Sequence, residues 1–70
     1  MKEKKRNTKI TSREKKIIRL IALGYTDIEI AEAIKLSYST VRLCLRQLLL
    51  KTATVNRANL INWAYQEKIL

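Results

Sequence analysis

Proline and histidine are absent from this chain of 70 residues, and glycine and cysteine occur once each. A single cysteine cannot form an internal disulfide, and the absence of histidine argues against a structural zinc site. With so little proline and glycine, turns and strands are poorly signalled and helices are favoured. No apolar run approaches the roughly 20 residues of a membrane span. A chain this short must obtain its stability from well-formed helices or from a partner chain.

Acidic residues are also scarce, six against fifteen lysines and arginines, which gives a formal net charge of +9. Residues 1–19 are strongly basic. The charged residues among 20–34 are all acidic, whereas residues 35–57 contain five basic residues and no acidic one. Such clustering favours a polyanionic partner, nucleic acid first and an anionic membrane surface second. A solubilising surface is the plainer explanation, but solubility does not require an acid-free stretch of 23 residues.

Four polar residues stand where helices are expected to begin: Thr11, Thr26, Ser37 and Asn56. Each can accept a hydrogen bond from the exposed backbone N–H groups of a first helical turn. Both threonines are followed three residues later by glutamate, which is the spacing of a capping box. The chain is therefore predicted to be all-α, with four helices at about residues 12–23, 27–34, 38–51 and 57–67.

The second and third predicted helices are joined by about three residues, the length of a helix-turn-helix connection. In the third helix one arc of about 140° is apolar and forms the core face, with Val41, Cys44, Leu45, Leu48 and Leu49. On the other side two arginines stand beside two leucines. A solvated surface explains the arginines but not the leucines. A helix in the DNA major groove explains both, because arginine can donate two hydrogen bonds to guanine and an aliphatic group can contact the thymine methyl.

Several motifs occur together in this order: "TSRE" at 11–14, "LIALGYTDIEIA" at 20–31, "STVR" at 39–42, Lys51, and "NR" at 56–57. In combination they resemble the LuxR-type (GerE-like) helix-turn-helix domain, which is also the output half of many bacterial response regulators. The resemblance implies a four-helix domain at residues 10–70. It implies that the third helix lies in the major groove and that the fourth commonly mediates dimerisation. Residues 1–9 are charged and polar with no periodic apolar face, so they are expected to form a disordered basic arm.

Three roles are assigned from this resemblance and from helix positions. The base-reading residues are Arg42, Leu43 and Arg46. The residues that hold DNA phosphates are Lys35, Ser39, Thr40 and Lys51. The residues of a dimer interface are Asn59, Asn62, Trp63 and Tyr65. Glu14 looks like the family's structural acid, which would brace the first helix. Departures from the family pattern are Cys44 for a frequent histidine, Leu50 for a frequent lysine, and "KTAT" at 51–54 for the usual "KLGV".

The fourth helix has more apolar surface than a small domain can cover. Leu60, Ile61 and Ala64 would face the core, and Trp63 and Tyr65 extend the apolar arc on both sides to about 200°. One helix lying on a domain buries roughly half of its circumference. A second copy can cover the surplus in a two-fold interface, which implies an inverted-repeat operator. The alternative is that Trp63 completes the intramolecular core or packs on the first helix.

These observations predict a bacterial, cytoplasmic transcription regulator that binds double-stranded DNA as a homodimer, on the nucleoid and without a cofactor or metal. The basic arm would follow the DNA backbone or enter a minor groove. Two alternatives use the same scaffold: a sigma-like promoter-recognition domain, and a protein-interaction module with a patch of Ile28, Leu43 and Leu50. An enzyme is not expected, because histidine is absent and Cys44 falls on the core face.

Overall fold

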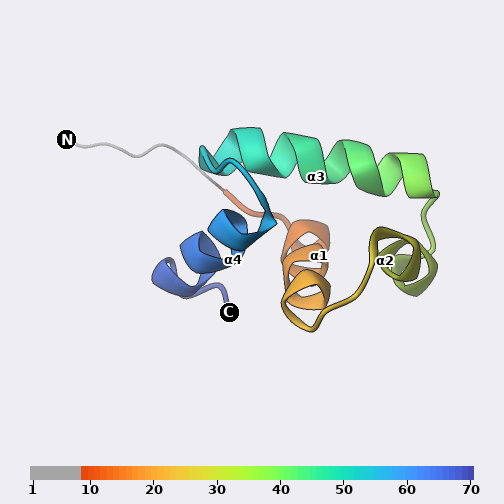
Figure 1. The fold of residues 1–70 in the computed structure, drawn as a ribbon, viewed down its shortest axis with the longest axis horizontal. Coiled ribbons are helices and arrows are strands. Elements are labelled where there is room, and N and C mark those ends of the chain that lie inside the picture. The colour runs from red at the N-terminus through yellow and green to blue at the C-terminus, as the bar shows by residue number, and fades with distance from the viewer. Residues whose placement is uncertain (1–8) are drawn as a thin grey trace.

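The structure is a computed structural model that describes residues 9–70, so most of the predicted basic arm lies outside the described residues. The described chain forms four helices: α1 (Ser12–Ala22), α2 (Asp27–Ile34), α3 (Tyr38–Thr52) and α4 (Arg57–Gln66). The prediction of an all-α fold is confirmed, and each predicted helix boundary lies within one residue of the observed one. Figure 1 shows α3, the longest helix, extending along one side of the domain over the other three.

The helices begin where the predicted caps stand. In the first capping box, the Thr11 hydroxyl accepts from the Glu14 N–H at 3.1 Å, and the Glu14 carboxylate accepts from the Thr11 N–H at 2.9 Å. The second box, at the start of α2, is complete in the same way. Ser37 and Asn56 cap α3 and α4 through their side-chain oxygens. At each of the four helix starts, a local side chain therefore accepts from at least one exposed N–H group.

The residues that end α2 and α3 adopt a strained backbone conformation. Gly24 follows α1 with a φ of 95°, as expected for a glycine that ends a helix. By contrast, Lys35 ends α2 and Ala53 ends α3 in the left-handed conformation, with φ values of 59° and 57°. A side chain with a Cβ is strained in that region by about 1–2 kcal/mol. The third helix thus ends at a residue with a Cβ and without a glycine, at the expense of backbone strain.

The core lies where α3 crosses the other helices. Its buried apolar side chains come from all four helices and are Ile17, Ile18, Ile30, Ala31, Val41, Leu45, Leu48, Leu60 and Ala64. Two residues of the predicted core face, Cys44 and Leu49, are only half-buried and pack at its edge. The apolar arc of α3 faces the core as predicted, and the residues at the centre of the arc are more buried than those at its edges. Among the described residues no helix is long and apolar enough to cross a membrane.

Candidate nucleic-acid interface

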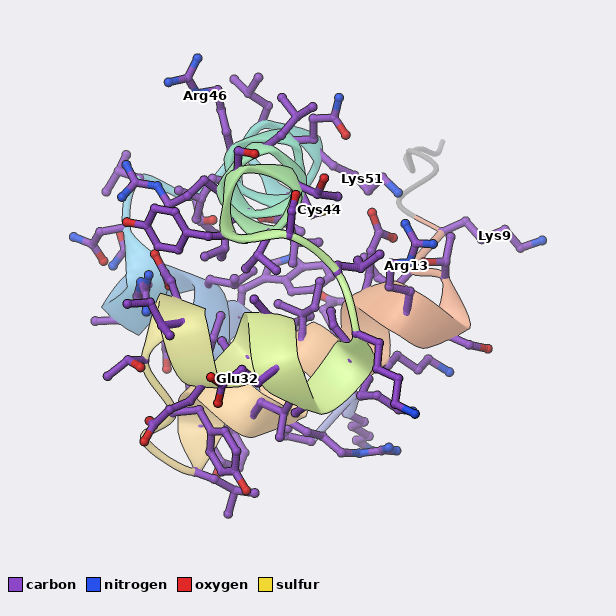
Figure 2. The ribbon with its side chains drawn as sticks, turned by 90° about the vertical axis from the view of Figure 1, so that its right-hand side faces the viewer. Lys9, Arg13, Glu32, Cys44, Arg46 and Lys51 are labelled. Atoms are coloured by element: carbon purple, nitrogen blue, oxygen red, sulfur yellow. The ribbon has the colours of Figure 1, made fainter. Side chains whose placement is uncertain are left out.

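The face of α3 that points away from the core is exposed and mixed in character. Arg42 and Arg46 lie one helical turn apart, and both are exposed. Between and beyond them Leu43 and Leu50 expose 53% and 76% of their surface. Figure 2, which looks along α3, shows Arg46 extending outward from the domain. The predicted base-reading residues therefore stand on one outward surface that carries guanidinium and aliphatic groups together.

Arg42 is held at one edge while most of its side chain remains open to solvent. Its Nη1 donates a hydrogen bond of 3.2 Å to the Tyr38 hydroxyl, and its guanidinium carbon lies 5.8 Å from the centre of the Tyr38 ring. The same Nη1 lies 3.9 Å from Oδ2 of Asp27, the first residue of α2. The side chain of Arg42 is still 59% exposed. It is thus oriented by the domain but free to meet a ligand.

A surface groove runs beside α3 and is lined by Ser39, Arg42, Leu43, Leu45, Arg46, Leu49 and Arg57. Three of these seven residues are arginines and none is an acid, so the groove favours an anionic ligand. Arg57 is the first residue of α4, and it reaches the groove from outside the helix-turn-helix. Arg57 is not among the predicted site residues, and its place in the "NR" motif at 56–57 was the available signal.

On the opposite flank of α3, the ammonium of Lys51 is paired with groups of the domain itself. Its ammonium donates to both carboxylate oxygens of Glu14 at 2.9 Å and to the backbone carbonyl of Lys9 at 3.2 Å. Figure 2 shows Lys51 pointing to the side where Lys9 and Arg13 lie, away from Arg46. Partial burial of the Glu14 carboxyl opposes ionisation, but the hydrogen bonds from Thr11 and Lys51 lower the pKa of Glu14 below its ordinary value. Lys51 and Glu14 therefore join the end of α3 to the start of α1.

The other predicted phosphate contacts lie in or next to the turn between α2 and α3. The Ser37 hydroxyl donates to the Thr40 hydroxyl at 2.8 Å and lies 3.4 Å from that of Ser39. Lys35 is exposed, and with Arg13 and Lys16 of α1 it lines a shallow hollow between α1 and the end of α2. The start of α3 thus presents hydroxyl groups, helix N–H groups and lysine charge to the solvent. Each of these groups can hold a phosphate.

The predicted dimer residues occupy two environments on α4. Trp63 is half-buried and packs against the core, whereas Tyr65 is 62% exposed. Asn59 and Asn62 are exposed. The core-facing residues Leu60 and Ala64 are fully buried as predicted, while Ile61 is half-buried. Trp63 thus buries part of its surface in the core of its own domain, as the alternative expects. The other part of its surface remains open.

Within residues 9–70 there is no group of three or more histidine, cysteine, aspartate or glutamate side chains placed to hold a metal ion. The free thiol of Cys44 is half-buried at the edge of the core.

A model of the LuxR family of bacterial regulatory proteins matches residues 8–64 of the chain. The matched segment contains α1, α2 and α3 entirely and α4 up to Ala64. It therefore includes the exposed face of α3, the turn before it and the groove beside it. No curated protein and no solved structure gives a significant match to the chain.

Proposed function

The chain belongs to the LuxR family of bacterial regulatory proteins, whose helix-turn-helix domain binds DNA in transcription regulators, and we propose that it reads a specific duplex sequence with α3 in the major groove. The observation that carries this proposal is the outward face of α3, where Arg42 and Arg46 stand exposed beside Leu43 with no acid among them. Such a mixture suits guanine edges and thymine methyl groups. Acting on the nucleoid, the protein would work in the bacterial cytoplasm.

The dimensions of α3 agree with this role. The major groove is about 12 Å wide and an α-helix with its side chains is about 10–12 Å across, so one exposed helix face fits it. Arg42 and Arg46 are four residues apart, about 6 Å along the helix axis. That spacing approaches two base-pair steps of about 3.4 Å. The two arginines would therefore read base pairs two steps apart, with Leu43 against a base between or beside them.

Phosphate contacts would flank the reading residues. We assign them to Ser39 and Thr40 at the start of α3, to Lys35 in the preceding turn, and to Lys51 near the other end. Lys51 already has three acceptors for its three N–H donors, so it must give one up to bind a phosphate. Its contribution to DNA affinity should be smaller than that of Lys35. These contacts would set the register of α3 in the groove rather than the sequence it prefers.

A homodimer through α4 would place two copies of α3 about one DNA turn apart on an inverted repeat. The proposal is supported by the exposed Asn59, Asn62 and Tyr65 beside the half-buried Trp63 on one helix. A two-fold interface would bring each of these residues against the same surface of its partner. It would also cover the remaining open surface of the indole.

Selection of bound duplexes from a random pool tests the function directly. We expect an enriched inverted repeat, and we expect affinity for it to fall steeply with salt, because each phosphate contact releases a counterion. A single promoter-like element without symmetry would favour the sigma-like alternative. Failure to enrich any sequence would contradict specific DNA reading.

A second candidate function is a protein-interaction module that docks a partner on the exposed leucines of α3. The specific observation in its favour is that Leu50, where the family frequently has lysine, leaves 76% of its surface open, more than the 53% of Leu43. Leu50→Lys separates the two functions. It should strengthen DNA binding if α3 faces DNA, and should leave DNA binding unchanged if α3 faces a protein.

A further inference from the structure

Asp27 links three helices at the edge of the proposed DNA-binding face. It is the first residue of α2, and its side chain is only 11% exposed. Its Oδ1 accepts a hydrogen bond from Nη2 of Arg57, the first residue of α4. Its Oδ2 faces Nη1 of Arg42 on α3 at 3.9 Å. The carboxylate is thus fixed from the α4 side and directed at an arginine of the reading helix.

The contacts of Arg42 leave one edge of its guanidinium available. Within residues 9–70, Arg42 makes its polar contacts to Tyr38 and Asp27 through Nη1. The pair formed by Nε and Nη2 is the other edge, and it can donate two parallel hydrogen bonds, as recognition of guanine requires. Tyr38 and Asp27 therefore hold the side chain by the nitrogen that this mode of recognition does not need.

We infer that Asp27 is a positioning residue for DNA reading: anchored by Arg57, it fixes Arg42 against Tyr38 so that the free guanidinium edge meets the bases in one orientation. This inference rests on the proposed function, since it assumes that Arg42 reads a base. An arginine side chain that is ordered before binding loses less rotamer freedom when it forms its hydrogen bonds. The acid therefore increases discrimination between base pairs although its charge repels the DNA backbone.

These two effects of Asp27 have opposite consequences for specific and random DNA. Asp27→Asn keeps the size of the side chain and raises the formal net charge by one, from +9 to +10. Electrostatics alone would make binding to every duplex equal or tighter. Loss of positioning would instead weaken binding only where Arg42 reads its base. The direction of the change on the two DNAs distinguishes a positioning residue from a charge that merely tunes affinity.

The experiment measures dissociation constants of the full chain on three duplexes at one salt concentration. The duplexes are the operator selected from a random pool, the same operator with the Arg42-dependent base pair exchanged, and a random sequence. The proteins are the wild type, Asp27→Asn, Arg42→Ala and the double variant. Glu32→Gln is the matched control, because Glu32 is an exposed acid on α2, the same helix as Asp27. Figure 2 shows Glu32 away from the outward face of α3 from which Arg46 extends.

We expect Asp27→Asn to reduce the operator preference over the exchanged duplex by about threefold to tenfold, the effect of weakening one hydrogen-bonded contact. Binding to random DNA should not weaken. In the Arg42→Ala background the same change should have no further effect on preference, because the residue that Asp27 positions is gone. Glu32→Gln should retain the wild-type preference.

Two outcomes overturn the inference while the proposed function stands: Asp27→Asn leaves the preference intact, or it lowers the preference equally with and without Arg42. If Arg42→Ala itself leaves the preference intact, the reading role of Arg42 fails, and the inference fails with it. Tyr38→Phe provides a second test should Asp27→Asn prevent folding, as judged by its melting curve. This variant removes the hydroxyl that accepts from Arg42. It should lower the preference for the operator without changing the affinity for random DNA. An unchanged preference would contradict the positioning of Arg42 by Tyr38 and Asp27.

Discussion

The carboxylate of Glu14 accepts two hydrogen bonds of 2.9 Å from the ammonium of Lys51, a residue 37 positions later in the chain. The same carboxylate caps α1 through the N–H of Thr11, so one side chain serves both the start of α1 and the end of α3. The position and tilt of the proposed reading helix therefore depend on an ion pair at its far end. This pair gives Glu14 the bracing role that the family resemblance implied for it.

Glu14→Gln should remove part of the acid sensitivity of folding. The folded pKa of Glu14 lies below its ordinary value of 4.5, so its stabilising contribution is complete above that value and is lost as the pH falls through the lowered pKa. We expect the free energy of unfolding of the wild type to fall more between about pH 7 and about pH 3 than that of the variant. Urea unfolding at the two pH values measures this difference. Glu32→Gln should keep the wild-type pH dependence, and equal losses in all three proteins would contradict the role of Glu14.

Ala53→Gly should stabilise the domain. Ala53 ends α3 with a φ of 57°, a conformation that glycine adopts without steric strain. We expect a gain of about 0.5–1 kcal/mol after the entropy of the unfolded chain is taken into account. A melting curve would show it as a rise of a few degrees, roughly 2–8 °C for a domain of this size. The matched substitution Ala33→Gly, at an exposed position inside α2, should destabilise by about 1 kcal/mol. A loss of stability at both positions would contradict the assigned strain.

Arg46→Ala should weaken operator binding by about 1–3 kcal/mol if Arg46 makes a bidentate contact with guanine. Because the contact is specific, random DNA should lose less affinity, and the preference should relax at one position of each half-site. Competition binding on operator variants measures both quantities. Arg19→Ala, which removes the same charge from an exposed position of α1, controls for the change in net charge. Equal weakening on operator and random DNA would assign Arg46 to a phosphate instead.

Asn62→Arg should separate the two copies of a dimer without disturbing the core. Asn62 is exposed on α4, whereas Trp63 is half-buried in its own domain, so the asparagine variant tests the interface more cleanly than Trp63→Ala. Two arginines facing each other across a two-fold axis would repel. Sedimentation across concentration, alone and with DNA, measures the oligomeric state. A wild type that remains monomeric at high micromolar concentration, both alone and on a single half-site, would contradict the α4 interface.

The sequence predicted those features that depend on neighbours along the chain. All four caps and the direction of the apolar arc of α3 were accessible, because a hydroxyl three residues before a glutamate or a leucine every third or fourth position acts locally. The ion pairs were not accessible. Asp27 meets Arg57 across 30 residues, and Glu14 meets Lys51 across 37, so both contacts depend on how the helices pack. The periodicity of α4 likewise gave the direction of Trp63 but not how much of it the domain covers.

Lys35 gives the turn before α3 a different character from the end of that helix. Both places force a side chain into the left-handed region, but Lys35 carries a charge that we assign to a DNA phosphate, whereas Ala53 carries none. Lys35→Gly would relieve the backbone and remove the charge together, so it should raise the melting temperature and lower DNA affinity. The turn is therefore a place where selection for binding opposes selection for stability. A selection for thermostable variants that did not require DNA binding would be expected to replace this lysine early. The resulting domain would be more stable and would bind DNA with lower affinity.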